Sequence, residues 1–322
     1  MDNLTHTLVG LMLARAGLDR GQKGTAAMLM LAANAPDIDA FPFFYDMVQY
    51  VEIHRGYTHA LAFAPLVALL PLAIVRGTTR TRPTLFEWFA CTVAVLSHLL
   101  LDWTNVYGTR LMLPFSREWF HLDITNIFDP LIWLILVVAV ALPNLLRLVG
   151  SEIGTHKKAG GQRAWAWVAL IAVLGYQGWR WNAHESALTQ LNALLYKGVP
   201  AKRVYAFPDS FGTFHWRGLI EGEEYYYEVP MEFNGRFTMF NAIQDFKPKK
   251  AKAVDAARTT RTFQVFEDFN QVPFWRISPL VDETKVELLD LRFGSFMQPG
   301  FSAMAMVDPD GRIKDLQFGF GR

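Results

Sequence analysis

The sequence predicts an α+β protein, in which a polytopic α-helical membrane domain is followed by a β-rich extracytoplasmic domain. Hydrophobic residues make up 52% of the 322 residues, which is high for a soluble chain. In the first half they gather in nearly uninterrupted apolar runs, whereas short alternating or aromatic-rich stretches fill the second half. We therefore expect residues 1–181 to form the helical transmembrane domain and residues 182–322 to form the β-rich domain.

The first half contains apolar runs of the length that membrane helices require, which is about 17–25 residues. The runs that approach or meet this length are residues 60–75, 86–101, 127–149 and 164–179. A fifth run, residues 25–44, contains Asn34 and two aspartates, so whether the first two helices cross the membrane fully stays open. The length of the runs disfavours the alternative of a soluble core.

After residue 181 the pattern changes to that of a β-rich domain. Residues 182–196 predict an amphipathic helix with leucines along one side. The following stretches show the alternation or aromatic enrichment that is typical of strands: residues 214–220, 225–233, 285–293, 302–307 and 314–320. Turn signals such as Asn234-Gly235 lie between these strand candidates.

The charge distribution predicts how the chain is oriented in the membrane. Basic residues concentrate in alternate connections, which usually face the cytoplasm; they are Arg15, Arg20, Lys23, Arg76, Arg80, Arg82, Arg147, Lys157, Lys158 and Arg163. We therefore expect a multi-pass protein of a bacterial or archaeal cytoplasmic (inner) membrane, with the C-terminal domain outside the cytoplasm. A net charge of +1 and the absence of a long basic run predict no nucleic-acid partner. Membrane lipids are the expected partners, and protein partners stay unknown.

His98 and Asp102 lie four residues apart near the end of an otherwise apolar run. On a helix this spacing places both side chains on one face, where a nitrogen and an oxygen donor suit one metal ion. The alternative is a hydrogen-bonded pair that holds two helices together. Because ionisable groups in a membrane are costly and by default mark function, we favour the metal site.

Two carboxylates, Asp37 and Asp39, follow Pro36, which disrupts a regular helix. One carboxylate can bind a metal while the other orients or deprotonates water. An Asp-rich turn at a helix end explains the same pattern equally well.

The segment His54-Arg55-Gly56-Tyr57-Thr58-His59 combines two imidazoles with a cation ahead of an apolar run. Thr58 is expected to cap the next helix, and the guanidinium of Arg55 suits a phosphate oxygen. Interfacial histidines beside a snorkelling arginine are the alternative reading.

Asp2 and His6 open the first helix, although helix capping by Thr5 explains part of this segment. The N-terminus lacks the basic region of a signal peptide, so we expect both residues to be retained.

The single cysteine, Cys91, excludes a cysteine zinc cluster. All the His and Asp motifs fall at the predicted outer ends of the helices, and three further residues flank the next span there. These residues, His121, Asp123 and Asp129, could complete a site, and the alternative for the two aspartates is a helix start.

Four ordered motifs carry a family resemblance: Met1-Asp2 with Thr5-His6, Pro36-Asp37-Ile38-Asp39, His54-Arg55-Gly56 with Thr58-His59, and Ser97-His98 with Asp102. Over roughly residues 1–150 the chain resembles the YdjM-type family of inner-membrane metal-dependent hydrolases. That family in turn resembles zinc-dependent phospholipase C and P1-type nucleases. The resemblance implies metal-ligand roles for His6, Asp37, His54, His59, His98 and Asp102. The His-x-x-x-Glu pair of the zinc phospholipases is missing, since His184 and Glu185 are adjacent, so one or two ions are expected instead of three.

We therefore expect a membrane-bound metal-dependent hydrolase that binds Zn²⁺, with Mn²⁺ or Fe²⁺ also suited to the donors. It would act as a phosphoesterase on a lipid or lipid-linked phosphate at the outer membrane face. Asp39 or Asp37 would act as the base, and Arg55 would hold a phosphate oxygen. A membrane peptidase is less favoured because the chain has no His-Glu-x-x-His motif. The other alternative is a non-catalytic membrane scaffold whose outer β-rich domain binds a partner.

Overall fold

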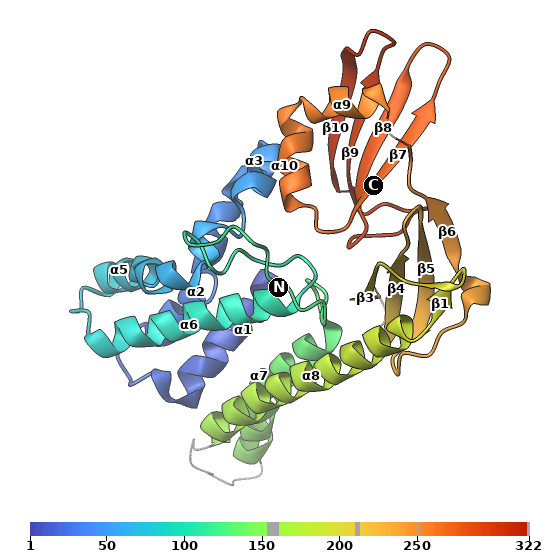
Figure 1. The fold of residues 1–322 in the computed structure, drawn as a ribbon. Coiled ribbons are helices and arrows are strands. Elements are labelled where there is room, and N and C mark those ends of the chain that lie inside the picture. Colours follow the sequence, from blue (N-terminus) through green and yellow to red (C-terminus); the bar gives the residue numbers. More distant parts are fainter. Residues whose placement is uncertain (153–160, 210–212, 250, 321–322) are drawn as a thin grey trace. The chain divides into compact units, whose positions relative to one another are not determined.

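The computed structural model of the chain describes residues 1–152, 161–209, 213–249 and 251–320 (Figure 1). Contacts divide the chain into two compact units. Unit 1 comprises Met1–Asp39 and Arg55–Asn182, and unit 2 comprises Ala40–His54 and Ala183–Arg322. Helices dominate up to residue 192 and strands follow, so the predicted α+β class is confirmed. Lys157 and Lys158, used above to orient the chain, lie outside the described residues.

Unit 1 is built from helices. The α-helices are α1 (Asn3–Leu13), α2 (Thr25–Ala32), α4 (Ala64–Val67), α5 (Leu69–Thr79), α6 (Leu85–Thr104), α7 (Pro130–Glu152) and the first part of α8 (Gly161–Asn192). A π-helical segment, η1 (Ala14–Leu18), follows α1. Three 3-10 segments are η2 (Ala35–Phe44), which continues into unit 2, η3 (Tyr57–His59) and η4 (Leu61–Phe63).

Helix α6 lies at the centre of this unit and packs against α1, α2, α4 and α5 (Figure 1). It begins with a capping box, in which Thr84 and Glu87 each bond the other's backbone N–H. The carboxylate of Glu87 also lies 2.9 Å from the guanidinium of Arg76, and both side chains are buried. This ion pair explains why an acidic residue stands near the start of an apolar run.

Three helical stretches in the described ranges are long and apolar enough to cross a membrane: Leu61–Thr79, Leu85–Thr104 and Pro130–Leu148. They confirm three of the predicted runs. The run at residues 164–179 lies in α8, which does not qualify as a span. The run at residues 25–44 does not form one helix either, because α2 ends at Ala32 and η2 follows with Pro36 and Pro42.

Unit 2 contains two four-stranded antiparallel sheets and a two-stranded ribbon. The first sheet has the order β3-β4-β5-β6, with strands Arg203–Pro208, His215–Glu221, Tyr225–Glu232 and Ile243–Phe246. The second has the order β10-β9-β8-β7, with strands Ile313–Phe320, Phe301–Val307, Thr284–Asp290 and Pro273–Pro279. The ribbon pairs β1 (Leu195–Tyr196) with β2 (Val199–Pro200), and the 3-10 segment η5 (Met239–Asn241) precedes β6.

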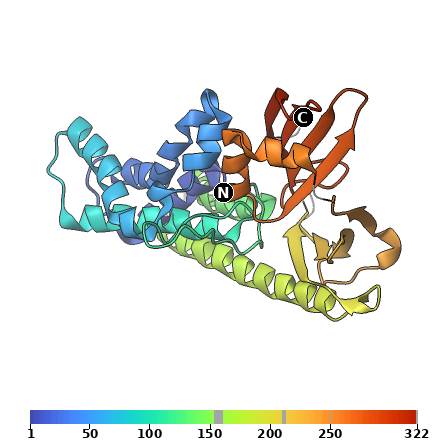
Figure 2. The same ribbon diagram turned by 45° about the horizontal axis from the view of Figure 1, so that its top comes forward.

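Helices α9 (Lys252–Arg258) and α10 (Arg261–Phe269) lie beside the second sheet (Figure 2). Phe263, Phe266 and Phe269 of α10 are fully buried. Helix α3 (Met47–Ile53) packs against α10, and Glu52 pairs with Arg261. These contacts assign residues 40–54 to unit 2, whereas a single boundary after residue 181 placed them in the helical domain.

All five predicted strand stretches correspond to strands, namely β4, β5, β8, β9 and β10. The amphipathic helix predicted at residues 182–196 is confirmed as far as Asn192, where it forms the last part of α8; β1 begins at Leu195. The buried face of that last part of α8, including Ala187 and Leu191, packs on the first sheet. Helices α9 and α10 were missed, although the i, i+3 spacing of the phenylalanines of α10 is a helical signal.

Candidate metal centre

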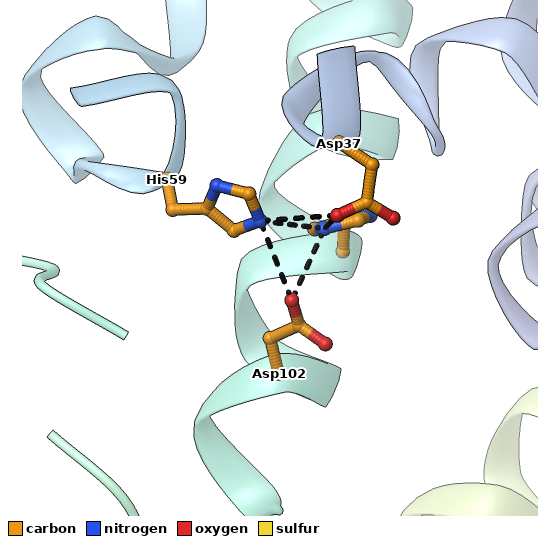
Figure 3. A group of neighbouring side chains, drawn as sticks. Asp37, His59 and Asp102 are labelled. Atoms are coloured by element: carbon orange, nitrogen blue, oxygen red, sulfur yellow. Dashed lines mark hydrogen bonds and ion pairs between the residues drawn. The ribbon is translucent and has the colours of Figure 1, made fainter. Parts of the chain in front are cut away.

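Four side chains of unit 1 bring ligand atoms to one point. Asp37 comes from η2, His59 from η3, and His98 and Asp102 from α6. One donor atom of each lies within 4.8 Å of all the others. Figure 3 shows Asp37, His59 and Asp102 directed toward one another from these separate elements. The predicted i, i+4 pair on α6 is thus part of a larger group.

The separations between these donors suit a single small ion. The Nε2 atoms of His59 and His98 are 3.1 Å apart. From Asp102 Oδ2 these nitrogens lie at 3.4 and 3.2 Å, and from Asp37 Oδ1 at 3.4 and 3.5 Å, respectively. Tetrahedral ligands bound to zinc at about 2.0–2.1 Å stand about 3.3 Å from each other. Two imidazoles and two carboxylates at these distances therefore fit the ion that the sequence predicts.

Hydrogen bonds on the far side of each imidazole orient its Nε2 toward the group. His98 Nδ1 lies 2.7 Å from the carbonyl oxygen of Ala33. A carbonyl only accepts, so Nδ1 carries the proton and Nε2 presents its lone pair. His59 Nδ1 lies 3.3 Å from Asp39 Oδ2 and 3.0 Å from Thr58 Oγ1. Such outer partners typically orient the histidine ligands of metal sites.

The pKa shifts of Asp37 and His59 are those expected where positive charge is stabilised. Burial opposes ionisation of Asp37, but hydrogen bonds from His59 and His98 hold its pKa well below the usual range. Burial likewise opposes the charged form of His59, yet hydrogen bonds to Asp37 and Asp39 raise its pKa overall. Two carboxylates thus stabilise positive charge at the point where a cation would bind.

Asp39 stands behind His59 and is not one of the four converging donors. Its Oδ2 accepts a hydrogen bond from the hydroxyl of Thr58 and another, at 3.1 Å, from the backbone N–H of Arg55. Thr58 therefore lies inside η3 and binds Asp39, so the prediction that it caps the next helix is wrong.

His6 lies against the group with no exposed surface. Its ring stacks on His98 with centroids 3.7 Å apart, and its Nε2 is 3.5 Å from Asp102 Oδ1. Neither ring nitrogen has a hydrogen-bond partner within the described residues. A buried imidazole without a partner is costly, so this position suits contact with a water or a further ion.

Arg55 and the N-terminal amine surround the outer oxygen of Asp102. Arg55 Nη2 donates to Asp102 Oδ1 at 3.1 Å, and Nη1 donates to Asn105 and to the Gly108 carbonyl oxygen at 3.1 Å each. The Met1 amine binds the same Asp102 oxygen. The roles of Asn105 and of the Met1 amine were missed. Only the position of Asn105, three residues after Asp102 at the helix end, gives a signal for it.

The remaining candidates are not members of this four-donor group. His54 belongs to unit 2 and stacks on Tyr50 with ring centroids 4.7 Å apart. His121 Nδ1 and Asp123 Oδ1 form a pair of their own at 2.8 Å. Asp129 accepts the backbone N–H groups of Leu131 and Ile132 at the start of α7, as the helix-start alternative predicts.

The helical half of the chain matches a known protein family. A family profile described as YdjM inner membrane protein matches residues 1–184. Uncharacterized protein YfhP of Bacillus subtilis (strain 168) is 23% identical over 329 residues, which cover 99% of this chain and 95% of YfhP. Inner membrane protein YbcI of Escherichia coli (strain K12) is 32% identical over 185 residues, which cover 55% of this chain and 96% of YbcI. No solved structure matches the chain. These matches do not show the further resemblance to phospholipase C and P1 nuclease.

Proposed function

Since the chain belongs to the YdjM inner membrane protein family, we propose that it is a membrane-bound, metal-dependent hydrolase centred on Asp37, His59, His98 and Asp102. The observation that supports the proposal most directly is the convergence of these four donors at ligand-like separations. Both imidazoles also present Nε2 to the same point. A merely structural cluster does not require this combination.

When bound at this point, a divalent ion such as Zn²⁺ would supply Lewis acidity and lower the pKa of water toward about 7. Asp37 and Asp102 provide the negative charge to hold it, and Mn²⁺ or Fe²⁺ also accept such donors. Ala33 and Asp39 keep the two histidines in the ligating tautomer. Arg55 and Asn105 hold Asp102 in place.

The solvent exposure of the side chains indicates from which side a substrate can reach the proposed site. The side chain of Asp37 is 13% exposed and that of Asp39 is 9% exposed, whereas His59, His98 and Asp102 show none. We therefore place the approaching substrate on the Asp37 side, where Asp37 or Asp39 accepts the proton of the attacking water. Arg55 is already engaged with Asp102 and Asn105, and its predicted contact with a phosphate oxygen stays a prediction.

We assign the substrate to the class of lipid or lipid-linked phosphates. His98 and Asp102 lie in the last two turns of Leu85–Thr104, one of the candidate spans. A site at the end of a span stands near the membrane surface, where an amphiphile concentrates. The outer face follows from the distribution of basic residues.

The test compares detergent-purified wild type with His98→Ala/Asp102→Ala and with Ser97→Ala as the matched control. Ser97 is a neighbour on α6 whose hydroxyl bonds only the Ala94 carbonyl oxygen among the described residues. We expect one or two metal equivalents by elemental mass spectrometry in wild type and control, and their loss in the double variant. Hydrolysis of a defined phospholipid and polyprenyl-phosphate library should be lost in parallel.

Two outcomes would oppose the proposal. A wild type that holds no metal after reconstitution with zinc or manganese would refute the metal centre. A fully loaded protein that hydrolyses nothing in the library would refute the phosphoesterase and favour the scaffold.

A further inference from the structure

A second cavity of unit 1 lies among α1, η1, α6 and α8 and has a volume of about 550 Å³. This volume is within the range of about 300–1,000 Å³ that is typical of ligand sites. Most of its lining is apolar, for example Leu13 of α1, Val93 and Leu100 of α6, and Leu170 and Leu174 of α8. None of its lining residues belongs to the four-donor metal group.

The cavity is long in the direction of the membrane helices. Along α6 its lining runs from Phe86 to Leu101. At about 1.5 Å per residue this stretch covers about 22 Å, which exceeds one hydrocarbon leaflet, about half of the 30 Å core. An extended acyl chain can therefore lie along α6 inside it.

One end of the cavity carries two guanidinium groups, those of Arg20 and Arg163. The Cζ of Arg20 lies 3.3 Å from the ring centroid of Phe86, and Arg163 Nε donates to the Ala16 carbonyl oxygen at 3.1 Å. Within the described part of the chain, neither arginine forms an ion pair with a carboxylate. The end of an apolar cavity thus holds two positive charges without an acidic partner.

Gly17 makes room for one of these charges. Its φ of 135° is unfavourable for other residues, and a Cβ there would stand 3.2 Å from Arg163 Nη2. Trp167 lies at the same end and donates Nε1 to the Ala16 carbonyl oxygen at 3.1 Å. Tryptophan and arginine are the residues that anchor helices at the level of lipid headgroups.

We propose that this cavity binds one phospholipid with an anionic headgroup. Its phosphate contacts Arg20 and Arg163, because guanidinium groups bind phosphate oxygens bidentately, and one acyl chain lies along α6. From His6 to Gly17 the chain advances about 16 Å along α1 and η1. The headgroup position is therefore separate from the metal group, and the proposal goes beyond the hydrolase and does not depend on it.

The experiment is native mass spectrometry of the full chain in detergent, titrated with palmitoyl-oleoyl phosphatidylglycerol or with phosphatidylcholine of the same chains. Wild type should bind one phosphatidylglycerol with an affinity at least about 10-fold above that for phosphatidylcholine. Arg20→Ala/Arg163→Ala should lose this preference. The charge-matched control, Arg82→Ala/Arg147→Ala, changes two exposed arginines that do not line the cavity and should keep it.

A further variant separates the cavity from a surface contact. Leu174→Trp fills the apolar part at an exposed position and leaves both arginines intact. It should weaken phosphatidylglycerol binding several-fold. Full binding by this variant, equal affinity of wild type for the two lipids, or an equal loss in the charge-matched control would each overturn the proposal.

Discussion

Asp39 lies next to His59 without being one of the four converging donors. It accepts hydrogen bonds from the Thr58 hydroxyl and the Arg55 backbone, and it lies behind the Nδ1 atom of His59. Arg55 has a left-handed φ of 59°, which is uncommon for a residue with a Cβ. The Arg55 backbone N–H that donates to Asp39 is thus presented from a strained residue, as is common where a site demands it.

We predict that Asp39→Asn weakens zinc binding without removing a ligand. Loss of such an outer partner typically costs 10–100-fold in metal affinity, while stoichiometry at saturating zinc should stay unchanged. Competition with a chromophoric chelator measures the affinity. Asp46→Asn is the control, because Asp46 caps α3 in unit 2 and Asn caps equally well. Loss of an equivalent at saturation would make Asp39 a ligand; unchanged affinity with slower turnover would make it the base.

Helix α6 supplies two of the four donors, so its start and its packing set where His98 and Asp102 stand. Glu87 has two tasks at that start. It completes the capping box with Thr84, and it neutralises Arg76, which also donates to the Lys23 carbonyl oxygen and the Thr25 hydroxyl. Burial of both charged side chains makes the ion pair the more important of the two tasks.

Substitutions at this helix start should therefore differ in cost. Thr84→Ala should lower the free energy of unfolding by about 1 kcal/mol through the lost cap. Glu87→Ala should cost about 3–5 kcal/mol, because it leaves the Arg76 charge buried and unpaired. Unfolding in detergent, followed by circular dichroism, measures both. Arg76→Ala/Glu87→Ala should cost less than the sum of its single changes; strict additivity would contradict the pairing.

The relatives differ in how much of this chain they match. YbcI aligns over 96% of its own length with only 55% of this chain, while YfhP aligns with nearly all of it. The family profile covers residues 1–184, which include every residue of the proposed metal centre. A relative can thus align over nearly its whole length with only about half of this chain.

We predict that the fragment of residues 1–184 folds in detergent and keeps the metal stoichiometry of the full chain. Residues 40–54 should lose protection in the fragment, because α3 packs on α10 in unit 2. Elemental mass spectrometry measures the first expectation and limited proteolysis the second. A folded fragment without metal would show that the centre needs unit 2.

Much of this protein's architecture can be predicted from local sequence patterns. Apolar runs, the i, i+4 spacing of His98 and Asp102, and the carboxylates after Pro36 are features of neighbouring residues, so the sequence alone predicts a helical membrane half, a β-rich half and candidate metal ligands. The assembly of the centre depends on distant segments. His98 meets the Ala33 carbonyl oxygen, 65 positions away. Packing between such distant segments decides which nitrogen of each histidine is available and places Asp39 behind His59. It also assigns His54 to unit 2 and forms the cavity that ends in two arginines. Local sequence periodicity does not predict any of these features.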